Sequence, residues 1–248
     1  MYKLPRITLY FWILKICATT LGETAGDLFS MTMKAGYAVS SLVLIGLFLI
    51  ALLFQLVSTR YRPVLYWTVI LLTSTAGTTM SDFMDRTLEL GYAKGSSILI
   101  ILLLSTLMIW KVTCRSLSVE HIRSRKAEVF YWIAILFSNT LGTALGDFLS
   151  DDSGLGFAGG ALLIGSLLVI IALVYFYTKI SRILLFWLAF ILTRPFGATM
   201  GDFLTKEKGG LNLGTLWSSV VLASILIVVM IVTIQNKNLH PEAKGELS

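Results

Sequence analysis

Four aspartates are the residues in this sequence whose type and spacing could do chemistry. Each ends a copy of one short pattern, in which two small residues four positions apart are followed directly by the acid. The four copies are Leu21–Asp27, Ala76–Asp82, Leu141–Asp147 and Phe196–Asp202. One pair of small residues at this spacing usually indicates only close helix packing. Four pairs that each end in aspartate predict a repeated carboxylate site.

Polar side chains precede each aspartate by three, four, seven or eight residues, positions that share one face of an α-helix. We expect this polar stripe to line a pathway, with the lining residues Thr20, Thr24, Thr75, Thr78, Thr79, Asn139, Thr140, Thr143, Thr199 and Arg194. The first copy also carries a second carboxylate, Glu23. The candidate metal ligands are therefore Asp27, Asp82, Asp147, Asp202 and Glu23.

The ligand chemistry favours a hard cation. No histidine or cysteine lies beside the motif, so carboxylate, hydroxyl and carbonyl oxygens are the available ligands. Such oxygens suit Mn²⁺, Mg²⁺, Ca²⁺, Na⁺ or H⁺ better than zinc or copper. Four carboxylates in one cavity cannot all remain ionised without a counter-ion, so a bound cation or shared protons would have to balance them.

The composition places these motifs in a membrane. The 248 residues are 56% hydrophobic and 14% charged, and the mean hydropathy is +0.82, which is too apolar for a soluble domain of this size. Apolar stretches of about twenty residues, the length that crosses a bilayer, predict eight transmembrane helices. They lie near residues 7–28, 36–58, 64–84, 91–113, 129–149, 156–178, 184–204 and 211–235.

The chain is built from repeats. A tryptophan precedes each aspartate by fifteen residues, at Trp12, Trp67, Trp132 and Trp187. We expect four helical hairpins, at residues 1–63, 64–126, 127–183 and 184–248. Because each hairpin has two helices, the repeats would be parallel, with pseudo-fourfold or two-plus-two symmetry. The result would be an all-α integral membrane fold.

Small residues should bring the first helices of the hairpins together. They are Gly22, Gly26, Gly77, Ser81, Gly142, Gly146, Gly197 and Gly201. Small side chains let helix backbones approach closely, so we expect these odd-numbered helices at the centre. The even-numbered helices are apolar almost all round and should form the lipid-facing periphery. An aspartate facing lipid costs roughly 2.5–3.5 kcal/mol at a helix centre, which also favours an inward polar stripe.

The distribution of basic residues predicts the orientation. Fourteen of the twenty Lys and Arg residues, Lys15 among them, lie at the N-terminus or in alternate loops. By the positive-inside rule both termini are cytoplasmic and the aspartates lie toward the extracytoplasmic side. Aromatic residues around each repeat's tryptophan are typical of a belt at headgroup level. The basic loop 111–126 is interpreted as a solvated linker.

Two departures from the repeat could give the site its direction or selectivity. Repeat one has the additional carboxylate Glu23, and repeat four has Arg194-Pro195 two turns before Asp202. An arginine inside a bilayer is a candidate functional group. It could pair with Glu23 or an aspartate, form a barrier in the pathway, or lock the bundle as a structural salt bridge.

The four motif regions resemble a known family. The runs Leu21–Asp27, Thr75–Phe83, Phe137–Phe148 and Leu192–Phe203 are similar to a bacterial family of small multi-spanning "membrane-anchored" proteins of uncharacterised function. The resemblance implies a bacterial inner-membrane protein and supplies no activity. A fainter similarity links Glu23–Asp27 to cation transporters with a Glu-x-Gly-Asp-(Lys/Arg)-(Thr/Ser) motif, although here the two acids are one residue further apart and no basic residue follows.

These observations favour a transporter or channel for a hard cation. The alternative is a membrane scaffold or sensor that uses the 111–126 loop as its contact. An intramembrane enzyme is disfavoured, because no nucleophile–base set is present and two catalytic acids would suffice. The expected partners are the lipid bilayer and an inorganic cation, with no nucleic acid.

Overall fold

The computed structural model describes residues 4–119, 122 and 124–239, and the regular structure in these residues is helical. Its long helices follow the predicted ranges closely. They are α1 (Leu9–Asp27), α2 (Tyr37–Val57), α3 (Pro63–Asp82), α4 (Tyr92–Cys114), α5 (Arg125–Asp147), α6 (Gly156–Tyr177), α7 (Arg182–Thr205) and α8 (Thr215–Leu239).

Local chemistry explains where these helices begin and turn. The Ser124 hydroxyl caps α5 by accepting a hydrogen bond from the Ala127 amide at 3.1 Å, and Pro63 occupies the first turn of α3, where its missing N–H costs nothing. In the first three repeats the chain leaves the odd helix through a π-helical turn, η1 (Leu28–Thr32), η2 (Phe83–Thr87) or η4 (Phe148–Asp152). Gly36 and Gly91 then take φ angles of 76° and 70° to start the next helix, a conformation that favours glycine.

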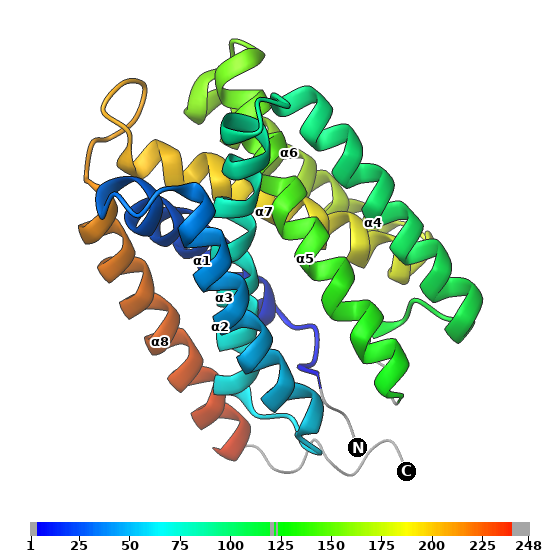
Figure 1. Ribbon diagram of the computed structural model, residues 1–248. Coiled ribbons are helices and arrows are strands. Elements are labelled where there is room, and N and C mark those ends of the chain that lie inside the picture. The colour runs from blue at the N-terminus through cyan, green and yellow to red at the C-terminus, as the bar shows by residue number, and fades with distance from the viewer. Residues whose placement is uncertain (1–3, 120–121, 123, 240–248) are drawn as a thin grey trace, which may run out of the picture.

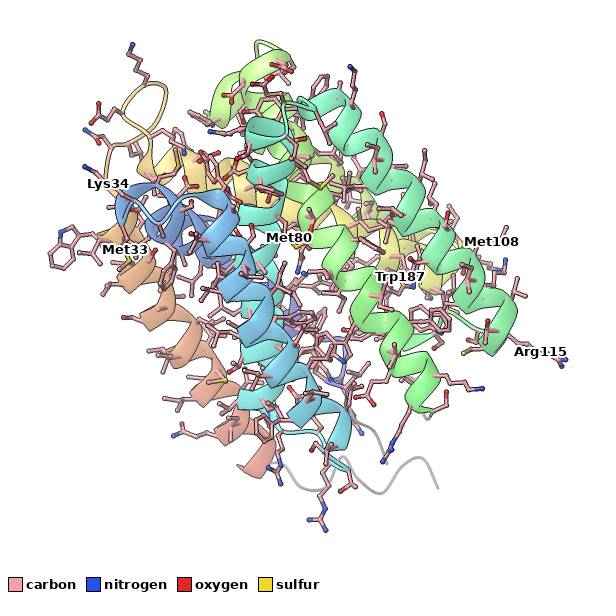
Figure 2. The ribbon with its side chains drawn as sticks, in the orientation of Figure 1. Met33, Lys34, Met80, Met108, Arg115 and Trp187 are labelled. Carbon is pink, nitrogen blue, oxygen red and sulfur yellow. The ribbon has the colours of Figure 1, made fainter. Side chains whose placement is uncertain are left out.

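The helices form two concentric layers. In the inner ring, α1 packs on α3, α3 on α5, α5 on α7, and α7 on α1. The even helices cover this ring, with α4 and α8 on opposite flanks of the bundle (Figure 1). Figure 2 shows Met108 of α4 and Arg115, the residue after this helix, projecting outward, and Trp187 of α7 directed into the bundle.

Glycines let the inner ring close. Gly22 of α1 lies against Ser74, and Gly26 lies one turn further on against Thr78, so α1 and α3 run in the same direction. The same contact recurs around the ring, from Gly77 to Asn139, from Gly142 to Arg194 and from Gly197 to Thr19. Each helix therefore offers a glycine face to the next repeat, and the fourth contact returns to the first helix.

The aromatic residues near the start of each odd helix pack between helices, so most of them are buried and do not face lipid and water as the rings of an aromatic belt would. Four pairs follow one another around the ring, with ring centroids 5.7 to 6.5 Å apart. The pairs are Phe11–Trp67, Tyr66–Trp132, Tyr131–Trp187 and Phe186–Trp12. All but Trp12 are buried. We call this layer the aromatic ring; it fills the tryptophan end of the inner bundle.

The 111–126 loop is also less solvated than expected. Val119 and Ile122 are buried in the core cluster, and the carbonyl of Leu117 accepts a hydrogen bond from the Trp187 indole at 3.1 Å. Apolar residues thus anchor the loop beneath the bundle. His121 and Arg123 of this loop, like His240, lie outside the described residues.

Six helices within the described part of the chain are long and apolar enough to cross a membrane. They are α2, α4, α6, α7, α8 and the continuous segment Arg125–Asp152. The chain therefore has the helices of a membrane protein. The remaining two, α1 and α3, do not reach this apolarity; both belong to the inner ring, where the other helices shield their polar residues.

The glycine contacts predict a site-specific loss of stability. A Cβ on Gly77 would lie 2.9 Å from the backbone carbon of Asn139 and 3.0 Å from the nitrogen of Thr140. We expect Gly77→Ala to lower the free energy of unfolding by about 1–3 kcal/mol, because a backbone cannot yield as a side chain can. The control is Gly46→Ala in α2, where an added Cβ would meet no described atom within 4 Å beyond the adjacent backbone of its own helix and alanine favours the helix by up to about 1 kcal/mol. Thermal unfolding in detergent checks both, and equal melting temperatures would contradict the closed ring.

Candidate functional site: a carboxylate cluster above a buried salt bridge

A buried ion pair lies where the four inner helices meet. The guanidinium of Arg194, from α7, contacts the carboxylate of Glu23, from α1, with Nη1 2.9 Å from Oε2. Arg194 is fully buried and Glu23 nearly so. This geometry realises one of the roles predicted for Arg194, which is pairing with Glu23. The burial of Arg194 is compatible with the two other predicted roles, a barrier in the pathway and a structural salt bridge that locks the bundle.

The other two inner helices hold this pair in place. The Nη2 atom of Arg194 donates to the hydroxyl of Thr78 at 2.6 Å and to that of Thr143 at 2.7 Å. Both hydroxyls also lie within 3.4 Å of the same Glu23 oxygen. Glu23, Thr78 and Thr143 each precede their aspartate by four residues, whereas Arg194 precedes Asp202 by eight. Each repeat thus contributes one side chain to what we call the central clasp.

The four motif aspartates lie one turn beyond the central clasp, and two basic side chains bridge them in pairs. Arg86 contacts Asp82 at 2.9 Å and Asp147 at 3.3 Å. Lys206 contacts Asp27 at 2.6 Å and Asp202 at 3.2 Å. Each base follows the aspartate of its own repeat by four residues, at a position occupied by Met31 and Asp151 in the other two repeats. The site therefore has two-plus-two pseudosymmetry.

The bridging bases remain charged and partly reach solvent. Burial lowers the pKa of Lys206, but the carboxylates of Asp202 and Asp27 outweigh burial and raise it above its ordinary value. About a third of the Arg86 side chain is exposed, whereas the aspartates that it contacts are buried. The bases thus form a partly hydrated lid on buried acids.

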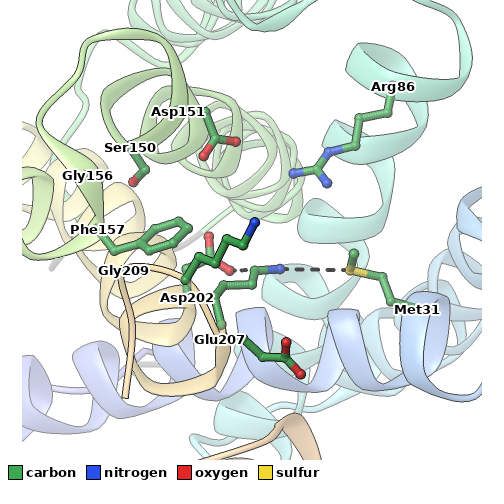
Figure 3. Close-up of a pocket in the computed structure, with 11 residues that line it drawn as sticks. Met31, Arg86, Ser150, Asp151, Gly156, Phe157, Asp202, Glu207 and Gly209 are labelled. Atoms are coloured by element: carbon green, nitrogen blue, oxygen red, sulfur yellow. Dashed lines mark hydrogen bonds and ion pairs between the residues drawn. The ribbon is translucent and has the colours of Figure 1, made fainter. Parts of the chain in front are cut away.

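A cavity of about 610 Å³ opens above this lid (Figure 3). Arg86 lines one side and Phe157, from α6, lines the other, with Asp202 at its base. Asp151 also lines the cavity and accepts a hydrogen bond from the Tyr92 hydroxyl at 3.1 Å. Of the four motif aspartates, Asp202 therefore lines a cavity that opens at one end of the bundle, which we call the aspartate end.

Three of the proposed metal ligands converge. Glu23, Asp147 and Asp202 each offer a carboxylate oxygen, and these oxygens lie within 4.8 Å of one another. Asp27 and Asp82 lie outside this group and contact the bridging bases. The five acids nevertheless form one continuous cluster, since Lys206 joins Asp27 to Asp202 and Arg86 joins Asp82 to Asp147. We call these five residues the carboxylate cluster.

The predicted pathway-lining residues divide into two sets. Thr78, Thr143, Asn139 and Arg194 contact side chains across the inner ring. The hydroxyls of Thr20, Thr24, Thr75, Thr79, Thr140 and Thr199 donate to carbonyls of their own helices. Thr24 also meets Ser219 of α8, and Thr199 lies against Gly160 of α6. For these two residues the polar stripe was interpreted too broadly, because it faces the outer layer as well as the axis.

Sequence reasoning missed the basic residues of the site. Neither Arg86 nor Lys206 was predicted to belong to the site, although their spacing of four residues from an aspartate is a helical ion-pair signal. Lys15 was counted among the basic residues that set the orientation, yet it is fully buried in the bundle. Its placement six residues into an apolar helix was the available clue.

The central clasp predicts that removal of Arg194 causes a large loss of stability, which a second substitution can restore. Arg194→Met should lower the free energy of unfolding by about 3–5 kcal/mol, because it leaves the Glu23 carboxylate buried without a charged partner. Adding Glu23→Leu should restore most of the loss, since a well-packed apolar pair can replace a buried salt bridge. Chemical unfolding in mixed micelles measures both, with the exposed Arg182→Met as control. An Arg194→Met protein as stable as the unaltered chain would contradict the clasp.

Comparison with known proteins places the four repeats in one family. No curated protein and no solved structure matches the chain. One family model, described as "Repeat of Unknown Function (DUF347)", matches four times, at residues 10–61, 65–116, 130–181 and 185–237. Each match contains one complete copy of the motif, from its tryptophan to its aspartate. The chain therefore belongs to the DUF347 repeat family, whose function is unknown.

Proposed function

We propose that this protein is a transporter for a hard cation in the bacterial inner membrane. In this proposal all eight helices span the bilayer, both termini are cytoplasmic, and the aspartate end faces the extracytoplasmic side. The shielding of α1 and α3 by apolar neighbours supports eight spans, since an inner helix need not be apolar all round. The basic residues of the alternate loops support the orientation.

The observation that carries this proposal is the charge imbalance of the buried site. The carboxylate cluster has five acids, and the bases that pair with it are Arg86, Arg194 and Lys206. Two negative charges are left over if every acid is ionised. In a poorly solvated interior such an excess is costly, so two protons, two monovalent cations or one divalent cation would balance it.

The ligand atoms favour a hard cation as the natural counter-ion. All five acids supply carboxylate oxygens, and the hydroxyls of Thr78 and Thr143 lie beside Glu23. Oxygen ligands of this kind suit Mn²⁺, Mg²⁺, Ca²⁺ or Na⁺. The three converging oxygens of Glu23, Asp147 and Asp202 could share one such ion.

The arrangement supports a carrier in preference to an open channel. The cavity reaches the carboxylate cluster from the aspartate end, whereas the central clasp and the aromatic ring fill the axis below it. A cation that enters has to displace the bases from their carboxylates, so Arg86 and Lys206 act as built-in competitors. Movement of these bases and of Arg194 would open the site toward the other end.

Cation uptake should depend on the carboxylate cluster. We expect Asp147→Asn to reduce cation uptake into proteoliposomes by about tenfold or more, because it removes an ionised ligand oxygen and leaves Arg86 with one partner. Uptake of Na⁺, Mg²⁺, Mn²⁺ and Ca²⁺ would be measured separately.

The matched control is Asp152→Asn, which makes the same change at an exposed residue five positions away. Asp152→Asn should transport as the unaltered protein does. Uptake that is equally fast in the unaltered protein, the Asp147 variant and empty liposomes would refute cation transport.

A further inference from the structure

A lysine lies inside the bundle, in contact with an amide and an aromatic ring. Lys15 of α1 is fully buried, and its ammonium lies 4.0 Å from the centre of the Phe190 ring. Its Nζ donates to the amide oxygen of Asn139 at 3.4 Å, and the Asn139 amide nitrogen donates in turn to Thr73 at 2.7 Å. Among the described residues, Lys15 forms no ion pair with a carboxylate.

The other repeats place apolar residues at the same position. Lys15 follows its tryptophan by three residues, and the residues that follow the other tryptophans by three are Ile70, Ile135 and Phe190. These three are also fully buried. They form with Lys15 one layer of the inner ring, which lies between the central clasp and the aromatic ring. We call it the lysine layer.

The charged group that acts on Lys15 repels its ammonium, and the other groups that face it are neutral. From α7 the guanidinium of Arg194 acts on it with like charge, and Phe190 offers only its ring face. From α3 and α5 the facing groups are Thr73 and Asn139, which are neutral. The described side chains of α8, which also packs on α1, include no ionisable group between Thr215 and Gln235.

Stability does not account for this lysine. A buried ammonium with one amide and one aromatic contact is worse solvated than in water, whereas isoleucine at the equivalent position would pack without that cost. An ionisable residue kept inside a membrane bundle points to a role in moving charge. Any cation that moves from the carboxylate cluster toward the tryptophan end has to pass the lysine layer.

We propose that Lys15 couples the passage of a cation to the release of a proton. This inference rests on the proposed function. As the cation approaches, an N–H bond of the Lys15 ammonium breaks, the electron pair remains on Nζ, and the proton passes to water at the aspartate end. The neutral amine lets the cation pass, and the electron pair on Nζ then binds a proton that enters from water at the tryptophan end. Each cation that moves inward is thus exchanged for one proton that moves outward.

Two substitutions with opposite charge behaviour test this exchange in proteoliposomes. Lys15→Arg fixes the positive charge, because a guanidinium does not lose its proton in proteins. Lys15→Met removes the charge and matches the apolar residues of the other repeats. Flux of the cation that shows Asp147-dependent uptake would be measured with and without a pH gradient, at a membrane voltage held at zero.

We expect Lys15→Arg to lower the flux by about tenfold or more, equivalent to at least about 1.4 kcal/mol of added barrier. Lys15→Met should keep its downhill flux within about threefold of the unaltered protein, a difference below 1 kcal/mol, and should lose all acceleration by the pH gradient. Ile135→Met, a packing control in the same layer, should keep that acceleration.

The outcomes separate this inference from the proposed function. Acceleration by the pH gradient in Lys15→Met, or full flux in Lys15→Arg, would overturn the role of Lys15 while leaving cation transport intact. Loss of downhill flux in Lys15→Met would also overturn it, since the inference requires that variant to conduct. Absence of Asp147-dependent flux in the unaltered protein would instead reject the proposed function.

Discussion

The closure of four parallel helices through glycine contacts is the constraint on which the rest of the structure depends. Gly22, Gly77, Gly142 and Gly197 each lie against the next repeat, at distances that leave no room for a Cβ. Close approach brings residues at equivalent positions of the four helices into layers. The central clasp, the aspartates, the lysine layer and the aromatic ring are such layers. A looser ring would separate their members and admit lipid or water between them.

The layers are symmetric in position and asymmetric in chemistry. The four aspartates are equivalent by sequence, yet only repeats two and four supply the bases Arg86 and Lys206 that bridge them. The central clasp joins an acid from repeat one to a base from repeat four. The lysine layer places one amine among three apolar residues. Single side-chain differences between the repeats thus make each layer chemically asymmetric, although the four helices that carry the layers are arranged symmetrically.

Much of the site could be predicted because the sequence repeats. Four copies of a motif on four helices imply that Asp27, Asp82, Asp147 and Asp202 lie at one level, and the small residues identify the packing face. The eight helices also follow from the apolar stretches between turns. Arg194 could be singled out because a charge within an apolar helix requires a partner or a role.

The sequence could not predict which neighbouring helix each polar or aromatic side chain of an inner helix contacts. An inner helix has neighbours on both sides and an outer layer behind it, so the polar stripe serves several surfaces. Thr24 consequently meets α8 while Thr78 meets the axis. The tryptophans were assigned to the bilayer surface because an aromatic residue near a helix end is common there, but here they fill the gaps between neighbouring helices. Spacing along one helix does not distinguish these surroundings.

The central claim is that the buried carboxylates are a cation site, and that the protein's own bases compete with the cation for these carboxylates. Equilibrium binding of radiolabelled Mn²⁺ or Na⁺ to the purified protein and to Lys206→Gln tests it most directly. Loss of the competing ammonium frees Asp27 and Asp202, so the account predicts saturable binding that becomes about tenfold tighter in the variant, a gain of about 1.4 kcal/mol. Absence of saturable binding in both proteins, or binding that weakens when Lys206 is removed, would contradict it.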